Sequence, residues 1–295
     1  MSASHPRRIV LDDGRLLAFD EWGDRKGAPV FSFHGGVSSR IDASPLHEAC
    51  KERGIRLIAP DRPGSGYSDP APKRSLLDWP NDVVELANAL GIERFGVMGW
   101  SLGGQYALAC AHALPRRVSR TAVLAGVVPF EVQPSRSGLA WYDRWLLTLC
   151  RWAPPLAAFG LWAGVRLPPL EGMQRIIYRD GNDADREALR RDPSPTLMAE
   201  AIKESVRAGT RGVIRDYRIW RDPWGFDLRR LHGEIGIWQG DEDEIVPLAE
   251  AEHLVELIPR AKLAVCAGEG HLSLPRNRVG EVVGWLAAPL LAEAA

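Results

Sequence analysis

Residues 94–104, which read R-F-G-V-M-G-W-S-L-G-G, decide the fold class. Residues 94–100 are largely apolar and predict a buried β-strand, and Leu102–Leu114 predicts a helix. Between them stands Ser101, with a glycine two positions away on either side. A serine at so tight a strand-to-helix turn has a strained backbone, and its small neighbours prevent clashes. We therefore expect the Ser101 hydroxyl to project from the carboxyl end of its strand.

The same alternation of strand and helix extends to both sides of this turn. Turn residues, such as the D-D-G of residues 12–14, separate the elements. Strands that alternate with helices predict an α/β fold, in which a mostly parallel central sheet has helices on both faces. The predicted strands are 8–11, 16–21, 29–33, 56–59, 94–100, 118–125, 235–239 and 262–267, and the predicted helices are 46–53, 82–90, 102–114, 248–257 and 279–291.

The middle of the chain has a different composition, which predicts a helical cap over residues 130–231. It lacks a clear strand and is rich in tryptophan, and paired prolines divide it into helices. The core is then formed by residues 1–129 and 232–295. The charge-free run 152–165 is too short to span a bilayer, which needs about 20 residues. We interpret it as a buried helix or a substrate wall.

Composition and charge restrict the class of protein. The 295 residues carry a formal net charge of -1 and no long basic run, so no nucleic-acid or anionic-membrane surface is indicated. Four separated cysteines and the lack of an apolar leader predict reduced, mostly buried thiols and a cytoplasmic location. Neither a phosphate-loop motif nor an H-E-x-x-H zinc motif occurs, and neither cofactor nor metal is expected. The oligomeric state is left undetermined.

A glycine-rich loop after the strand 29–33 is the candidate oxyanion hole. It reads His34-Gly35-Gly36-Val37, and glycine lets a backbone approach a ligand closely. We predict that the N–H groups of Gly36 and Leu102 bind the oxyanion, with Val37 as the alternative to Gly36. His34 is expected to be structural and to bond a neighbouring loop.

Two later loops supply the candidate acid and base, in the chain order serine, acid, histidine. His271 follows the strand 262–267, and we expect its preceding glycines to allow a close approach to Ser101. The acid lies in the loop D-E-D-E after the strand 235–239. Asp243 is favoured, while Asp241 and Glu131 remain alternatives.

These motifs together resemble those of the α/β-hydrolase superfamily over nearly the whole chain. The H-G-G of residues 34–36, the D-x-x-G-x-G-x-S of 61–68 and the G-W-S-L-G-G of 99–104 match its loops, as do the acid and histidine loops. The resemblance implies a cap and a triad of Ser101, Asp243 and His271. It also ranks Asp243 over Asp241. Members that cleave epoxides or carbon–halogen bonds use an aspartate at the elbow, where this chain has serine.

The resulting hypothesis is a serine hydrolase that cleaves a small or medium apolar ester, or a related lactone or amide, through an acyl-enzyme. We predict a small-molecule acyl substrate. Two alternatives stay open, namely a serine aminopeptidase and a catalytically silent binding protein. The aminopeptidase needs an acidic anchor for the substrate amine, with Asp143, Glu171 and Glu200 as candidates. The residues predicted to contact substrate are Trp100, Val37, Trp141 and Trp145.

Overall fold

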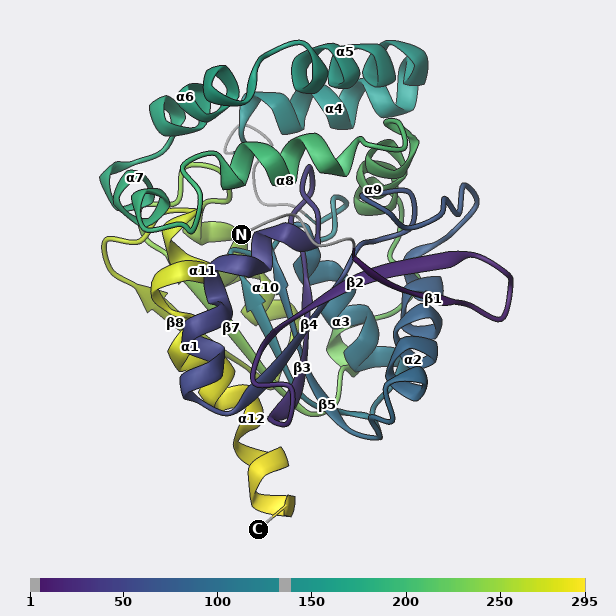
Figure 1. Ribbon diagram of the computed structural model, residues 1–295, viewed down its shortest axis with the longest axis vertical. Helices are drawn as coiled ribbons and strands as arrows, with labels where there is room; N and C mark the ends of the chain where they lie inside the picture. The colour runs from purple at the N-terminus through teal and green to yellow at the C-terminus, as the bar shows by residue number, and fades with distance from the viewer. Residues whose placement is uncertain (1–5, 133–138, 295) are drawn as a thin grey trace.

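The computed structural model describes residues 6–132 and 139–294, and its centre is one eight-stranded sheet (Figure 1). The spatial order is β1-β2-β4-β3-β5-β6-β7-β8, in which all pairs from β4 to β8 are parallel. The first two strands pair antiparallel at one edge. The predicted mostly parallel sheet is therefore confirmed. The strands are β1 Arg7–Val10, β2 Leu16–Gly23, β3 Ala28–Phe33, β4 Ile55–Pro60, β5 Phe95–Trp100, β6 Val118–Leu124, β7 Glu234–Gly240 and β8 Ala261–Cys266.

Helices cover both faces of the sheet, as expected for parallel strands. Helices α2, α3 and α10 pack on one face, and α1 and α12 pack on the other. Every residue of β5 is buried, which explains why its sequence is a continuous apolar run. The core helices are α1 His47–Glu52, α2 Trp79–Ala89, α3 Gly103–Ala113, α10 Leu248–Leu257, α11 Ser273–Asn277 and α12 Val279–Ala294, with 3₁₀ turns η1 Arg40–Leu46, η2 Leu76–Asp78 and η4 Leu228–Arg230.

Helices α2 and α11 differ from the sequence prediction for local reasons. Helix α2 begins at Trp79, three residues before the predicted start. Its Pro80 lies in the first turn, where proline is tolerated because the N–H there needs no helical partner. Helix α11 has only five residues, too few for an apolar period to reveal it.

Six helices between β6 and β7 lie together at one end of the molecule (Figure 1). We call this group the cap helices; the boundaries 130–231 of the cap as a domain remain a prediction. Within residues 6–132 and 139–294, no helix is long and apolar enough to cross a membrane. The cap helices are α4 Trp141–Trp152, α5 Pro154–Arg166, α6 Leu170–Asp180, α7 Asp183–Arg190, α8 Leu197–Ser205 and α9 Arg211–Arg221.

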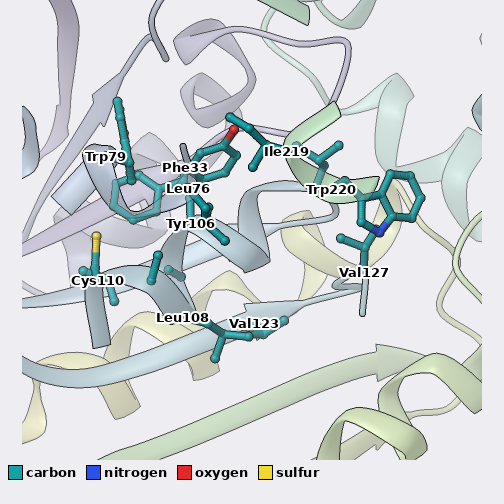
Figure 2. Close-up of a cluster of buried hydrophobic side chains, with 14 of the residues drawn as sticks. Phe33, Leu76, Trp79, Tyr106, Leu108, Cys110, Val123, Val127, Ile219 and Trp220 are labelled. Atoms are coloured by element: carbon teal, nitrogen blue, oxygen red, sulfur yellow. The ribbon is translucent and has the colours of Figure 1, made fainter. Parts of the chain in front are cut away.

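The cap helices share a hydrophobic cluster with the core. Ile219 and Trp220 of α9 pack into the same cluster as Tyr106 of α3 and Val127 after β6 (Figure 2). The Trp220 indole also donates a 2.8 Å hydrogen bond to the Val128 carbonyl. Helix α9 is thus part of the packed interior.

The Trp220→Ala substitution tests this packing. Truncating a buried tryptophan removes apolar contact and leaves a cavity, so the free energy of unfolding should fall by about 3–5 kcal/mol. The matched control is Trp152→Ala, because Trp152 is 74% exposed; its effect should stay within about 0.5 kcal/mol. Urea denaturation measures both variants. Equal losses would contradict the assignment of α9 to the shared core.

Candidate active site

Ser101 occupies the turn between β5 and α3 in the left-handed backbone conformation, with φ 54°. Its N–H donates a 2.8 Å hydrogen bond to the Leu124 carbonyl on the neighbouring strand. A Cβ added at Gly99 would lie 2.2 Å from the Gly103 carbonyl oxygen, so only glycine fits there. A non-glycine residue held at positive φ stores strain that the surrounding structure must support. The turn has the strained form that its sequence predicts.

His271 follows β8 and is hydrogen bonded to Asp243, in the loop that follows β7. The His271 Nδ1 lies 2.8 Å from Asp243 Oδ2, and both side chains are buried. The other Asp243 oxygen accepts bonds from the backbone N–H groups of Ile245 (2.9 Å) and Val246 (2.8 Å). The carboxylate is thereby fixed in position, and it fixes the orientation of the imidazole.

The two alternative acids lie elsewhere. Asp241 is exposed and accepts a 2.7 Å bond from the Gly268 N–H, which closes the loop after β8. Glu131 is exposed after β6. Of the three candidates, Asp243 is the one that the structure pairs with His271.

The pKa of His271 reflects two opposing effects. Burial alone lowers it, because the charged ring is poorly solvated in the interior. The Asp243 carboxylate raises it through its charge and through the hydrogen bond, and the carboxylates of Asp185 and Asp143 add to this effect. The net result is a pKa above the usual value of 6.5.

Trp100 connects the histidine loop to the serine turn. Its indole N–H donates a 3.1 Å bond to the His271 carbonyl, and its ring centroid lies 5.2 Å from that of His271. Since Trp100 directly precedes Ser101, these contacts bring the histidine beside the strained turn. A Cβ at Gly35 would lie 3.0 Å from the Trp100 ring, so the H-G-G loop closes on the same tryptophan.

The H-G-G loop is held by the guanidinium of Arg62. Arg62 Nη2 donates a 2.6 Å bond to the Gly35 carbonyl, and Nη1 donates to the His34 carbonyl. The Arg62 N–H donates to His34 Nε2 at 3.2 Å, so His34 bonds a neighbouring loop as predicted. Gly36 lies against Leu102, because a Cβ there would be 3.5 Å from Leu102 Cδ1.

Arg62 is in turn paired with a carboxylate from the cap. Its Nε donates a 2.9 Å bond to Asp216 on α9, and both side chains are fully buried. Arg74 and the Tyr106 hydroxyl donate to the other Asp216 oxygen. Burial by itself raises the pKa of Asp216, but the two guanidinium groups outweigh it and lower the pKa to about 2. Asp216 is therefore ionised, and it links α9 to the H-G-G loop.

A second cap carboxylate holds the histidine loop. Asp185 of α7 accepts bonds from the N–H groups of Leu272 (2.9 Å) and Ser273 (2.8 Å), which immediately follow His271. A Cβ at Gly270 would lie 2.5 Å from Asp185 Oδ1. Gly270 therefore leaves room for the cap, and the expectation that the glycines before His271 allow its close approach to Ser101 stays a prediction.

A third cap carboxylate, Asp143 on α4, lies near both loops. It is buried and accepts a hydrogen bond from the Tyr217 hydroxyl. That hydroxyl lies 3.2 Å from the position of a Cβ on Gly36. Burial raises the pKa of Asp143 to about 6, although the bond from Tyr217 and the charge of His271 act in the opposite direction. Glu171 is exposed on α6, and Glu200 is bonded to Thr196 and Ser194.

The predicted substrate contacts divide into two groups. Trp100 is buried beside His271, and Val37 is packed against the core cluster. The structure does not bring the other two to Ser101, because Trp141 is 67% exposed and the Trp145 ring rests on Gly160 of α5. The run 152–165, interpreted as a buried helix or a substrate wall, is not buried on one face. Its exposed apolar side chains are Trp152, Leu156, Phe159 and Trp162.

Comparisons with known proteins identify the family and agree with the fold. The model of the alpha/beta hydrolase fold family matches residues 28–277. The chain belongs to the alpha/beta hydrolase fold family. The match extends from β3 to α11, so it includes the H-G-G loop, the cap helices and the histidine loop.

Similar proteins of this family have several chemistries. The chain is 30% identical to a 2-hydroxymuconate semialdehyde hydrolase of Pseudomonas putida, over 90% of this chain and 87% of the relative. It is 27% identical to a non-heme chloroperoxidase of Streptomyces lividans, over 89% and 92%. Among solved structures, an esterase from Exiguobacterium antarcticum superimposes with a TM-score of 0.69 at 22% identity, covering 95% of this chain and 99% of the esterase.

The Asp216→Asn substitution tests the link between cap and core. It leaves Arg62 and Arg74 buried without their counter-ion, and breaking a buried pair costs about 3–5 kcal/mol in free energy of unfolding. The matched control is Asp183→Asn on α7, whose side chain is 99% exposed and pairs with Arg186. That variant should lose less than about 0.5 kcal/mol. Thermal unfolding measures both, and a neutral Asp216→Asn would refute the link.

Proposed function

We propose that this alpha/beta hydrolase is a serine hydrolase that cleaves apolar carboxylic esters through an acyl-enzyme. The observation that carries the proposal is the buried 2.8 Å contact between His271 and Asp243, held by Trp100 beside the strained Ser101 turn. In this scheme Ser101 is the nucleophile and His271 the general base. Asp243 orients the ring and stabilises its protonated form.

The reaction proceeds in two acyl transfers. His271 accepts the Ser101 proton while Oγ bonds to the acyl carbon, and the carbonyl electron pair moves to oxygen. The C–O bond of the ester then breaks, and the leaving alcohol takes the proton from His271. Water repeats the sequence with His271 as base, which releases the acid and restores Ser101.

The oxyanion is assigned to two backbone N–H groups. Leu102 lies at the start of α3, where N–H groups lack helical partners. The Gly35 N–H is already donated to Asp42 at 3.3 Å, and we assign the donor from the H-G-G loop to Gly36, with Val37 as the alternative. The contact between Gly36 and Leu102 supports a shared site. Loss of one such donor typically reduces kcat by about 10²–10³.

The apolar acyl specificity rests on what surrounds this site. Trp100 packs against the His271 ring, Val37 directly follows Gly36, and the Tyr217 hydroxyl of α9 lies 3.2 Å from the position of a Cβ on Gly36. A neighbour named esterase supports ester cleavage. No cofactor takes part in the proposed scheme.

Asp143 favours one second candidate, a serine aminopeptidase. Its buried carboxylate lies close enough to His271 to affect the pKa of that ring, and a carboxylate there can pair with a substrate ammonium group. This reaction needs the same Ser101 and His271. Hydrolysis of aminoacyl p-nitroanilides, with Asp143→Asn as the variant, distinguishes it from ester cleavage.

Labelling by a fluorophosphonate probe tests the nucleophile. Wild type should label and hydrolyse p-nitrophenyl esters, with a preferred acyl length that measures the pocket. Ser101→Ala and His271→Ala should lose both, because the residual rate without a triad member is orders of magnitude lower. The control is His253→Ala, since His253 lies on α10 and pairs with Glu256. Labelling that persists in Ser101→Ala would refute the assignment.

The pH profile tests the role of Asp243. The base must be neutral to act, so kcat/KM should rise with pH as His271 loses its proton. The midpoint of this rise should lie above 6.5, because the pKa of His271 is raised from that value. Asp243→Asn removes the raising charge and leaves the lowering effect of burial. We expect the midpoint to move down and kcat to fall by about 10⁴. Asp241→Asn, in the same loop, should keep the wild-type profile; an unshifted midpoint in Asp243→Asn would contradict the pairing.

A further inference from the structure

Helices α4 and α5 expose a set of large apolar side chains. Each helix exposes them on one face, because their spacing follows the helical period. The spacing is i, i+4, i+11 on α4 (Trp141, Trp145 and Trp152) and i, i+3, i+6 on α5 (Leu156, Phe159 and Trp162). Seven of the twelve exposed large apolar side chains in the described part of the chain fall within residues 141–167. We call this surface the aromatic face; it consists of Trp141, Trp145, Trp152, Leu156, Phe159, Trp162 and Leu167.

The opposite sides of the same helices are apolar too. Leu146, Leu147 and Cys150 of α4 are buried, as are Leu161 and Val165 of α5. A surface helix normally presents polar side chains to water, whereas a helix that is apolar all round is covered on all sides. The buried side of α4 and α5 is covered by the rest of the cap helices. The aromatic face lies on the other side, so it needs a different apolar partner to cover it. A patch of this kind marks an interaction site.

Within the segment 141–167 that carries the aromatic face, the exposed charged side chains have one sign. The exposed charged residues of the segment 141–167 are Arg144, Arg151 and Arg166. Its single acidic residue, Asp143, is buried and bonded to Tyr217. The Arg151 guanidinium lies 5.0 Å from the Trp152 ring centroid, which places positive charge at the edge of the aromatic surface.

The apolar aromatic face and the exposed arginines of its segment together indicate what binds there. A second copy docked through the same face would bring arginines toward arginines, with no carboxylate in the segment to pair them. Tryptophan and phenylalanine prefer the boundary between acyl chains and headgroups, and arginines beside them attract anionic lipids. We propose that the aromatic face binds the surface of an anionic phospholipid bilayer, with α4 and α5 lying in the interface plane.

The proposed binding does not depend on the proposed catalysis, because its readout is partitioning and not turnover. A bilayer contact at the cap would place the protein where apolar esters dissolve, which fits the proposed substrate class. The proposal departs from the sequence expectation of no anionic-membrane surface, which rested on the lack of a long basic run, because here three separated arginines supply the charge.

Vesicle sedimentation with the full chain carrying Ser101→Ala tests the proposal. Binding to vesicles of phosphatidylcholine with about one third phosphatidylserine should exceed binding to pure phosphatidylcholine. Each arginine near an anionic surface contributes about a five-fold change in affinity, so the triple variant R144Q/R151Q/R166Q should lose this preference. Brominated acyl chains should quench the tryptophan fluorescence of the bound protein.

Two apolar variants complete the test. W152S/F159S should bind far more weakly to both vesicles, while V10S/V265S, which alters exposed residues on β1 and β8, should bind as the parent does. Circular dichroism and thermal unfolding check that both are folded. Equal binding of the two double variants, or no binding by the parent protein, overturns the proposal. A dimer that W152S/F159S dissociates also overturns it, in favour of a second copy.

Discussion

The buried carboxylate of Asp216 is the interaction on which the arrangement of the site depends. It neutralises Arg62 and Arg74 at once, and Arg62 uses its remaining N–H groups to hold the carbonyls of His34 and Gly35. A guanidinium without a counter-ion would be too costly to bury at this depth. The H-G-G loop therefore has its observed shape because α9 of the cap is in place. The conformation of the H-G-G loop and the docking of α9 therefore depend on the same buried charges, and each stabilises the other.

The histidine side of the site has the same construction. Asp185 of α7 accepts the N–H groups of Leu272 and Ser273, and it occupies the space that Gly270 leaves open. Two cap helices thus hold, with one carboxylate each, the two loops that flank Ser101. Buried carboxylates satisfied by backbone or guanidinium donors keep a single geometry, because every alternative leaves a charge unpaired. The cap helices therefore position the H-G-G loop and the histidine loop.

The sequence was sufficient for the sheet and for the Ser101 turn, because both depend on local pattern and strand order. The choice of Asp243 as the partner of His271 rested on the resemblance to the α/β-hydrolase superfamily, since local pattern left Asp241 and Glu131 open. The sequence was not sufficient for Asp216 or Asp185, whose partners lie more than 80 residues away. A signal for both was nevertheless present. Val213, Asp216, Tyr217 and Trp220 form one i, i+3, i+4, i+7 stripe, and Asp185 shares its stripe with two apolar residues. An acid in an apolar stripe indicates a buried partner before that partner is known.

Helices α4 and α5 present the opposite case, because they carry apolar residues on an exposed face, where polar residues are expected. From sequence alone, the charge-free run after Trp152 had the composition of a buried helix, and composition cannot tell which of two apolar environments covers it. The structure separates them, since Leu161 and Val165 contact the interior while Phe159 and Trp162 are exposed. Exposing large apolar side chains to water is costly, and a cluster of them on a surface marks an interaction site. With arginines as the exposed charges of that segment, an anionic interface satisfies both the apolar area and the charge.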